Sequence, residues 1–170
     1  MEGFTTKKQQ FATVWKMHTA GDAQWYPAQV PGTVYTDLLR NGQMEDPFWK
    51  DNEYRALDLM EKDYEYETVF EGTEAQEGER QWLRFEGLDT ICDIYLNEEK
   101  IGNTYNMHRT WEFDVTGKVK AGENILRVYF HSPLEYIKEA YEKQQEEKTE
   151  SLQENPEEIK QEEINEKKEK

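Results

Sequence analysis

The sequence is poor in several features that define familiar protein classes. Its 170 residues include one cysteine, Cys92, so no intramolecular disulfide can form and a cytoplasmic setting is expected. No apolar run reaches the length of a membrane span, and the first residues lack the apolar core of a signal peptide, so neither is expected. Lysine and arginine form no cluster, and the formal charge is −16. This balance argues against nucleic acid and anionic membranes as partners.

Motifs for common catalytic and metal chemistry are also missing. The three histidines, His18, His108 and His131, are not spaced as metal ligands, and no serine-hydrolase, phosphate-loop or zinc-protease motif occurs. Cys92 lies in an apolar stretch and is interpreted as a small buried side chain. Acidic residues are abundant, but glycoside hydrolysis needs two carboxyl groups at a set separation. The sequence therefore predicts no catalytic residue, no metal site and no cofactor.

Aromatic and charged residues are unevenly distributed along the chain. Hydrophobic residues make up 35% and the mean hydropathy is −1.10, yet aromatic residues reach 13%. Residues 138–170 hold 12 acidic and 7 basic residues, whereas all five tryptophans lie before them. This division predicts a folded domain over 1–137 and a charged tail over 138–170. The tail begins with helical spacing, and we expect a solvated helix that breaks at Asn155-Pro156 and fades into disorder.

Short alternating segments dominate the domain. Strands are predicted at 65–71, 81–86, 90–97, 101–104, 111–115 and 124–130, with a four-residue turn at 97–100. In the third of these, Cys92, Ile94 and Leu96 share one face. One short helix is predicted after the N-cap Thr33, with Leu38 and Leu39 on its buried face. Without βαβ alternation, the pattern favours an all-β antiparallel sandwich, most plausibly a jelly roll.

Two segments combine aromatic and polar side chains. In residues 46–54, the combination is typical of sugar recognition, but the residues alone favour a loop pinned into the core by Phe48 and Trp49. Residues 104–111 form either a polar cluster that faces a ligand or partner domain, or a β-turn. In the turn, Asn106 bonds the local backbone and Arg109 pairs with a surface acid.

An ordered series of strings resembles the N-terminal domain of β-mannosidases in glycoside hydrolase family 2. The strings are VPGTVYTDLL (30–39), DPF (46–48) with Asn52-Glu53, DYEY (63–66), FEGLDT (85–90), IYLN (94–97), IGNT (101–104), NMHR (106–109), FDVT (113–116) and SP (132–133). The resemblance covers residues 15–137 and implies a galactose-binding-like jelly roll.

The resemblance also implies a role. In that family the catalytic glutamates lie on a later barrel, so this chain resembles an accessory domain that shapes the substrate entrance and has no catalytic residue. Its implied partners are a β-mannoside, in the full enzyme, and the remaining glycosidase domains, including the catalytic barrel. Asn52 matches a position that, in the family, reaches toward the sugar. Its neighbours Asp51, Glu53 and Trp49 are therefore expected to lie near the substrate, and Phe48 is expected to hold the loop. The family's Trp-Asp-Trp segment is absent after Ser132-Pro133.

Two other hypotheses remain from the residues alone. The chain can be a free-standing carbohydrate-binding module whose exposed loop aromatics contact the ligand. Alternatively, it can be an interface scaffold that docks on a neighbouring domain through an apolar edge.

Overall fold

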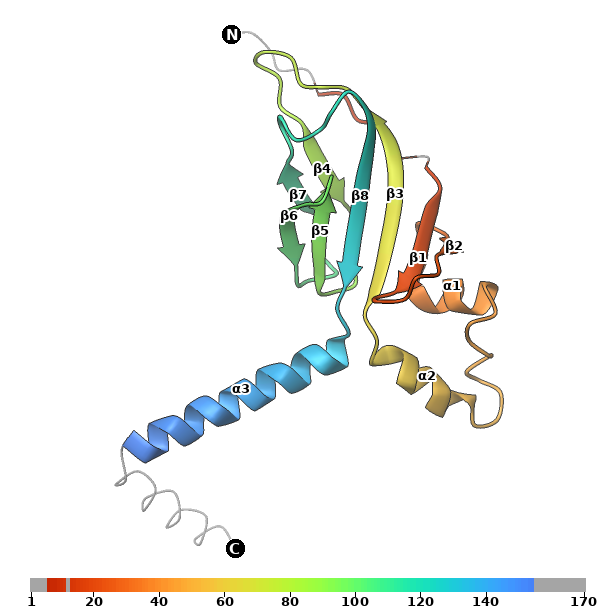
Figure 1. The fold of residues 1–170 in the computed structure, drawn as a ribbon, viewed down its shortest axis with the longest axis vertical. Helices are drawn as coiled ribbons and strands as arrows, with labels where there is room; N and C mark the ends of the chain where they lie inside the picture. Colours follow the sequence, from red (N-terminus) through yellow and green to blue (C-terminus); the bar gives the residue numbers. More distant parts are fainter. Residues whose placement is uncertain (1–5, 12, 155–170) are drawn as a thin grey trace, which may run out of the picture. The chain divides into compact units, whose positions relative to one another are not determined.

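The structure is a computed structural model that describes residues 6–11 and 13–154 (Figure 1). The chain divides into two compact units, residues 1–133 and residues 134–170. This division lies slightly before the boundary at 137 that the charge distribution predicts.

The first unit is an antiparallel β-sandwich with unequal layers (Figure 1). The larger sheet has six strands in the order β2-β1-β3-β8-β5-β6. The strands are β1 (Trp15–Thr19), β2 (Tyr26–Ala28), β3 (Tyr64–Gly72), β5 (Cys92–Leu96), β6 (Glu99–Thr104) and β8 (Gly122–Phe130). The smaller sheet pairs β4 (Trp82–Phe85) with β7 (Trp111–Asp114). Every pairing is antiparallel, which confirms the predicted all-β sandwich.

Alternation along the strands fills the core. On β5, the side chains of Cys92, Ile94 and Leu96 are buried as predicted, and they face the same interior as Leu126 and Val128 of β8. Leu83 of β4 belongs to the same core. Each fully buried aliphatic side chain contributes roughly 1.5–3 kcal/mol, so this central row is the main source of stability.

The first helix, α1 (Val34–Arg40), begins where the sequence predicts. Thr33 caps it, and Thr33 and Thr36 form a reciprocal capping box. Leu38 is buried, but Leu39 is 39% exposed, so its predicted burial is wrong. Instead, the carboxylate of Asp37 points inward, where it accepts bonds from the Tyr66 hydroxyl and the Gln29 amide.

Two local predictions are wrong, and one strand has no prediction at all. The second helix, α2 (Asn52–Met60), begins inside the segment predicted as a loop, and β1 was not predicted as a strand. The turn between β5 and β6 contains two residues rather than four, because Asn97 and Glu98 both adopt positive φ, 51° and 71°. Two residues with positive φ form the turn whose twist matches a tight hairpin.

The second unit is described through helix α3 (Pro133–Glu154), which confirms that the tail begins as a helix. The Lys138 ammonium lies 3.4 Å from a Glu135 carboxylate oxygen, a one-turn pair on the helix surface. The expected break at Asn155-Pro156 lies outside the described residues. In the described ranges, no helix combines the length and apolar character that crossing a bilayer requires.

Candidate functional site

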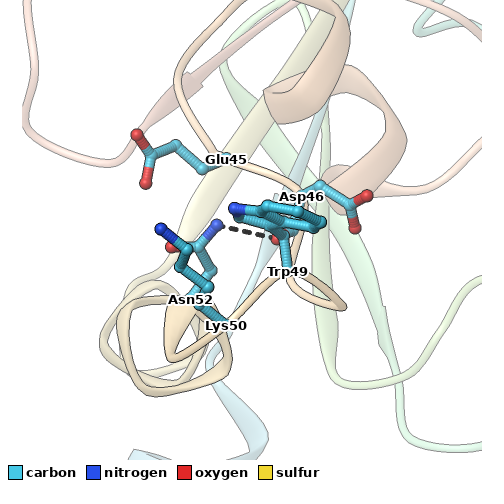
Figure 2. Close-up of a pocket in the computed structure, with 5 residues that line it drawn as sticks. All are labelled: Glu45, Asp46, Trp49, Lys50 and Asn52. Atoms are coloured by element: carbon cyan, nitrogen blue, oxygen red, sulfur yellow. Dashed lines mark hydrogen bonds between the residues drawn. The ribbon is translucent and has the colours of Figure 1, made fainter.

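The candidate site is the loop before α2 together with the first residue of that helix. Its backbone turns around Asp46: the Asp46 carboxylate accepts the Phe48 amide at 3.0 Å, and its carbonyl accepts the Trp49 amide at 3.1 Å. The Asn52 side-chain amide donates to the same carbonyl at 2.9 Å, the bond drawn dashed in Figure 2. These bonds hold the part of the loop next to α2, while Met44, earlier in the same loop, is buried in the core.

The two loop aromatics point away from the core. Phe48 is 95% exposed and Trp49 is 65% exposed. The expectation that Phe48 holds the loop is therefore wrong, and so is the interpretation in which both rings are core anchors. The physical reason is the bond network around Asp46 and Asn52, which fixes the loop from within. Both rings are left available to another molecule.

An open pocket of about 510 Å³ lies over this loop. Its lining residues are Glu45, Asp46, Trp49, Lys50 and Asn52. Figure 2 shows the Trp49 indole at the centre of the group. The pocket combines one broad apolar ring with carboxylate, ammonium and amide groups. This is the set of groups that contacts the apolar face and the hydroxyls of a sugar.

Charges in the pocket are only partly compensated. Glu45 pairs with Arg55 of α2 at 2.9 Å, and both side chains are exposed. The Lys50 ammonium lies 5.8 Å from the centre of the Trp49 ring, close enough for a cation–π contact. Exposed pairs of this kind contribute little to stability. They leave the pocket polar, open and easy to rearrange around a ligand.

The structure brings together some of the predicted site residues and not others. Trp49 and Asn52 both line the pocket, whereas Asp51 and Glu53 are exposed beside it and do not line it. Asp51 holds the N-cap position of α2 without a side-chain capping bond, and its carbonyl accepts the Tyr54 amide at 3.2 Å.

Three lining residues, Glu45, Asp46 and Lys50, are not among the predicted site residues, although Asp46 and Lys50 lie in the segment 46–54 that the sequence singles out. A signal existed for Asp46, because an aspartate at the start of a turn commonly bonds the backbone amide two residues on. Nothing in the local pattern distinguishes Glu45 or Lys50 from other exposed charged residues.

The second segment from the sequence, between β6 and β7, builds a compact loop of its own. The Asn106 side chain accepts the His108 amide at 2.9 Å, as the turn interpretation predicts. Among the residues that the structure describes, no acidic side chain forms an ion pair with Arg109. Its guanidinium lies 4.5 Å from the ring of Trp111, whose indole N–H donates to the Asn106 carbonyl. The hypothesis that this loop faces a ligand or partner domain stays a prediction.

Two histidines have a single acidic neighbour each. His18 lies 3.4 Å from Glu65, and His131 lies 3.2 Å from Asp93. Among the residues that the structure describes, no three histidine, cysteine or acidic side chains gather as a metal site requires.

Comparison with known proteins gives a consistent result. The profile of the family described as "Glycosyl hydrolase 2 galactose-binding domain-like" matches residues 15–167. β-Mannosidase of the goat, Capra hircus, is 36% identical over 132 residues, which are 76% of this chain and 15% of that enzyme.

Solved structures agree with the sequence comparison. The β-D-mannosidase of Dictyoglomus thermophilum superposes with a TM-score of 0.70 and 38% identity, over 75% of this chain and 16% of that one. Exo-chitosanase CsxA of Amycolatopsis orientalis shares the fold, with a TM-score of 0.60 and 21% identity over 71% of this chain and 16% of its own. The chain thus spans about 15% of the length of the relatives it matches.

Proposed function

This chain belongs to the glycosyl hydrolase 2 galactose-binding domain-like family, and from that membership we propose that it is the non-catalytic N-terminal domain of a β-mannosidase-like exoglycosidase. In this proposal, other domains, including a catalytic barrel, hydrolyse terminal β-D-mannose residues. The similarity to two β-mannosidases at 36% and 38% identity supports this substrate class.

The pocket before α2 is the part of the domain that faces the sugar in this proposal. The Trp49 ring packs against the apolar face of the sugar, and Asn52 offers its amide oxygen to a hydroxyl. The Asn52 amide nitrogen already donates to Asp46, which fixes the orientation of the amide oxygen. The observation that carries the proposal is the exposure of Trp49 beside this oriented amide.

A docking role is the second part of the proposal. Phe48, Tyr54 and Leu57 are 95%, 64% and 50% exposed, and the last two lie one turn apart on α2. Large apolar side chains gathered on a surface are typical of a protein interface. We propose that they contact a neighbouring domain of the full enzyme, which also brings the pocket to the substrate entrance.

The isolated chain tests the absence of catalysis. We expect no hydrolysis of a chromogenic β-mannoside by the 170-residue chain. Turnover that a single acidic substitution abolishes would contradict the proposal.

In calorimetric titration with manno-oligosaccharides, we expect no binding tighter than about 1 mM, which corresponds to roughly −4 kcal/mol. Tighter binding that Trp49→Ala removes would favour a free-standing carbohydrate-binding module.

A chimera tests the sugar-facing role. The domain replaces its counterpart in the D. thermophilum enzyme, and the KM and kcat for a chromogenic β-mannoside are measured. We expect Trp49→Ala and Asn52→Ala to raise KM by roughly tenfold, about 1.4 kcal/mol of lost substrate binding. The matched control is Trp82→Ala, which removes a 53%-exposed tryptophan from β4. An active chimera in which all three variants share one KM refutes the sugar contact.

A further inference from the structure

Asp63 occupies the junction between α2 and β3, and it binds two groups from the C-terminal end of the domain's sequence. One carboxylate oxygen accepts the backbone amide of Ser132 at 2.6 Å, and the other accepts the Tyr129 hydroxyl at 2.6 Å. Tyr129 lies on β8, and Ser132 follows that strand, 69 positions after Asp63 in the sequence. The junction therefore joins two segments that are distant in the sequence and meet only in the folded domain.

The same residues hold the end of α2. The Ser132 hydroxyl donates to the Met60 carbonyl at 2.6 Å, and the Tyr64 hydroxyl donates to the Leu59 carbonyl at 3.0 Å. Carbonyl groups in the last turn of a helix lack partners further along the helix, so these side chains stabilise the C-terminal end of α2. Ser132 is only 2% exposed, which keeps water from competing for the bond.

Little else fixes α2 to the sandwich. Of its nine residues only Ala56 is buried, and Leu59 packs partly against the core. Tyr54 and Leu57 are exposed. With so small a buried face, the position of the helix depends on the bonds at its C-terminal end more than on apolar packing.

The Tyr129 hydroxyl, which donates to Asp63, stays protonated. Burial, and then the bond to Asp63 and its negative charge, raise the pKa of Tyr129 far above its usual value of 10.0. The phenol therefore remains protonated and keeps donating to Asp63 over the physiological pH range.

We propose that Asp63, Tyr129 and Ser132 form a clamp that positions α2 and, through the helix, places Asn52 at the pocket. A nine-residue helix is rigid and roughly 13 Å long. A pivot at its C-terminal end therefore moves its first residue, Asn52, whose amide fixes the loop through Asp46. The three residues are positioning residues, and the proposal does not depend on which ligand the pocket takes.

Hydrogen exchange of the 170-residue chain, measured by nuclear magnetic resonance, tests the clamp. We expect Ser132→Ala and Tyr129→Phe, each of which removes one hydroxyl donor, to speed exchange of the α2 amides by about tenfold or more. The amides at the centre of β3 and β8 exchange at the wild-type rate. The side-chain amide signals of Asn52, at the other end of the helix, shift or broaden in both variants.

The matched control is Thr104→Val, which removes another buried hydroxyl, one that donates to the Thr90 carbonyl at 3.0 Å. It leaves the exchange of α2 and the Asn52 signals unchanged. Exchange in α2 that rises no more in Ser132→Ala and Tyr129→Phe than in Thr104→Val overturns the proposal. Equal acceleration across the whole sheet also overturns it, because the residues then contribute only to general stability.

Discussion

At the scale of single residues, Asp37 shows how much one carboxylate can organise. It is fully buried and accepts bonds from the Gln29 amide, the Tyr66 hydroxyl and the Arg40 guanidinium. A buried charge is costly unless such partners compensate it. The three bonds join the loop before α1, the helix itself and the first half of β3. The sequence places Asp37 in the first turns of a helix, but nothing local shows that its side chain points inward.

Cys92 gives a direct prediction at the same scale. Its side chain is inaccessible to solvent, and burial raises the pKa of the thiol to about 12. We expect no reaction with a thiol-specific disulfide reagent at about pH 8 while the chain is folded, since the thiolate is the reactive form. One equivalent reacts after addition of concentrated guanidinium chloride. Rapid labelling of the folded chain would show that the sheet opens at β5.

The candidate site was only partly predictable at this scale. Residue type draws attention to the segment 46–54, but it is the family resemblance that singles out Asn52, with Trp49 beside it. The exposure of Phe48 was not predictable in this way, since an aromatic ring in a loop is more often an anchor. What decides the matter is a set of bonds to Asp46 that depends on the exact path of the backbone.

At the scale of elements, the alternation of apolar and polar residues predicts the strands, whereas no such pattern predicts the helix α2. In β3 and β5, every second side chain is buried, which is the pattern that the sequence shows. In α2 only Ala56 is buried, so no apolar stripe marks the helix, and Pro47 and Asp51 favour a loop. The short strand β1 has buried residues on both faces, since Met17 and His18 are both covered. Its tertiary neighbours, rather than its own pattern, define it.

Contact between the two layers at Gly102 gives a prediction for β6. A β-carbon there would overlap the ring of Phe113 on β7, with 2.6 Å to its Cδ1 atom. We expect Gly102→Ala to reduce the free energy of unfolding by about 1–3 kcal/mol, measured by urea denaturation, because the ring must leave its place. Gly87→Ala is the control, since no atom lies within 4 Å of its β-carbon. Equal stability of the two variants would mean that the layers are not packed this closely.

At the scale of the whole molecule, the strong negative charge coexists with a partly neutralised sheet face. The net charge is −16, yet Glu65, Glu67 and Asp93 on the outer face of the large sheet have cationic partners. Glu67 pairs with Lys16 at 2.8 Å, and Asp93 pairs with Lys100 at 2.7 Å. Arg127 lies 3.4 Å from Glu65 and also stacks over Tyr95. Glu71 and Glu123 lie opposite each other on β3 and β8, so only part of this face is neutralised.

The ion pair between Asp93 and Lys100 stabilises the fold only between two pH limits, which are set by the pKa values of the two side chains. Burial alone would raise the pKa of Asp93, but hydrogen bonds from Lys100 and His131 outweigh it and hold this pKa below 3.8. A lowered pKa in the folded state means that the stabilisation is present above the unfolded pKa and is lost as the pH falls through the folded one. For Lys100 the bond to Asp93 raises the pKa above 10.5, so its contribution is lost only as the pH rises beyond that value.

Urea denaturation as a function of pH therefore separates this pair from the total charge. Asp93→Asn should lower the free energy of unfolding near neutral pH by about 1 kcal/mol or less, since Lys100 is half exposed and water screens the pair. The variant and the wild type should converge only as the pH falls through the lowered folded-state pKa of Asp93, below 3.8, because both then carry a neutral side chain at this position. Asp58→Asn, on the exposed side of α2, changes the net charge equally and should not lower the free energy of unfolding near neutral pH. Parallel curves for the two variants would assign the effect to overall repulsion, not to the bonds across β5 and β6.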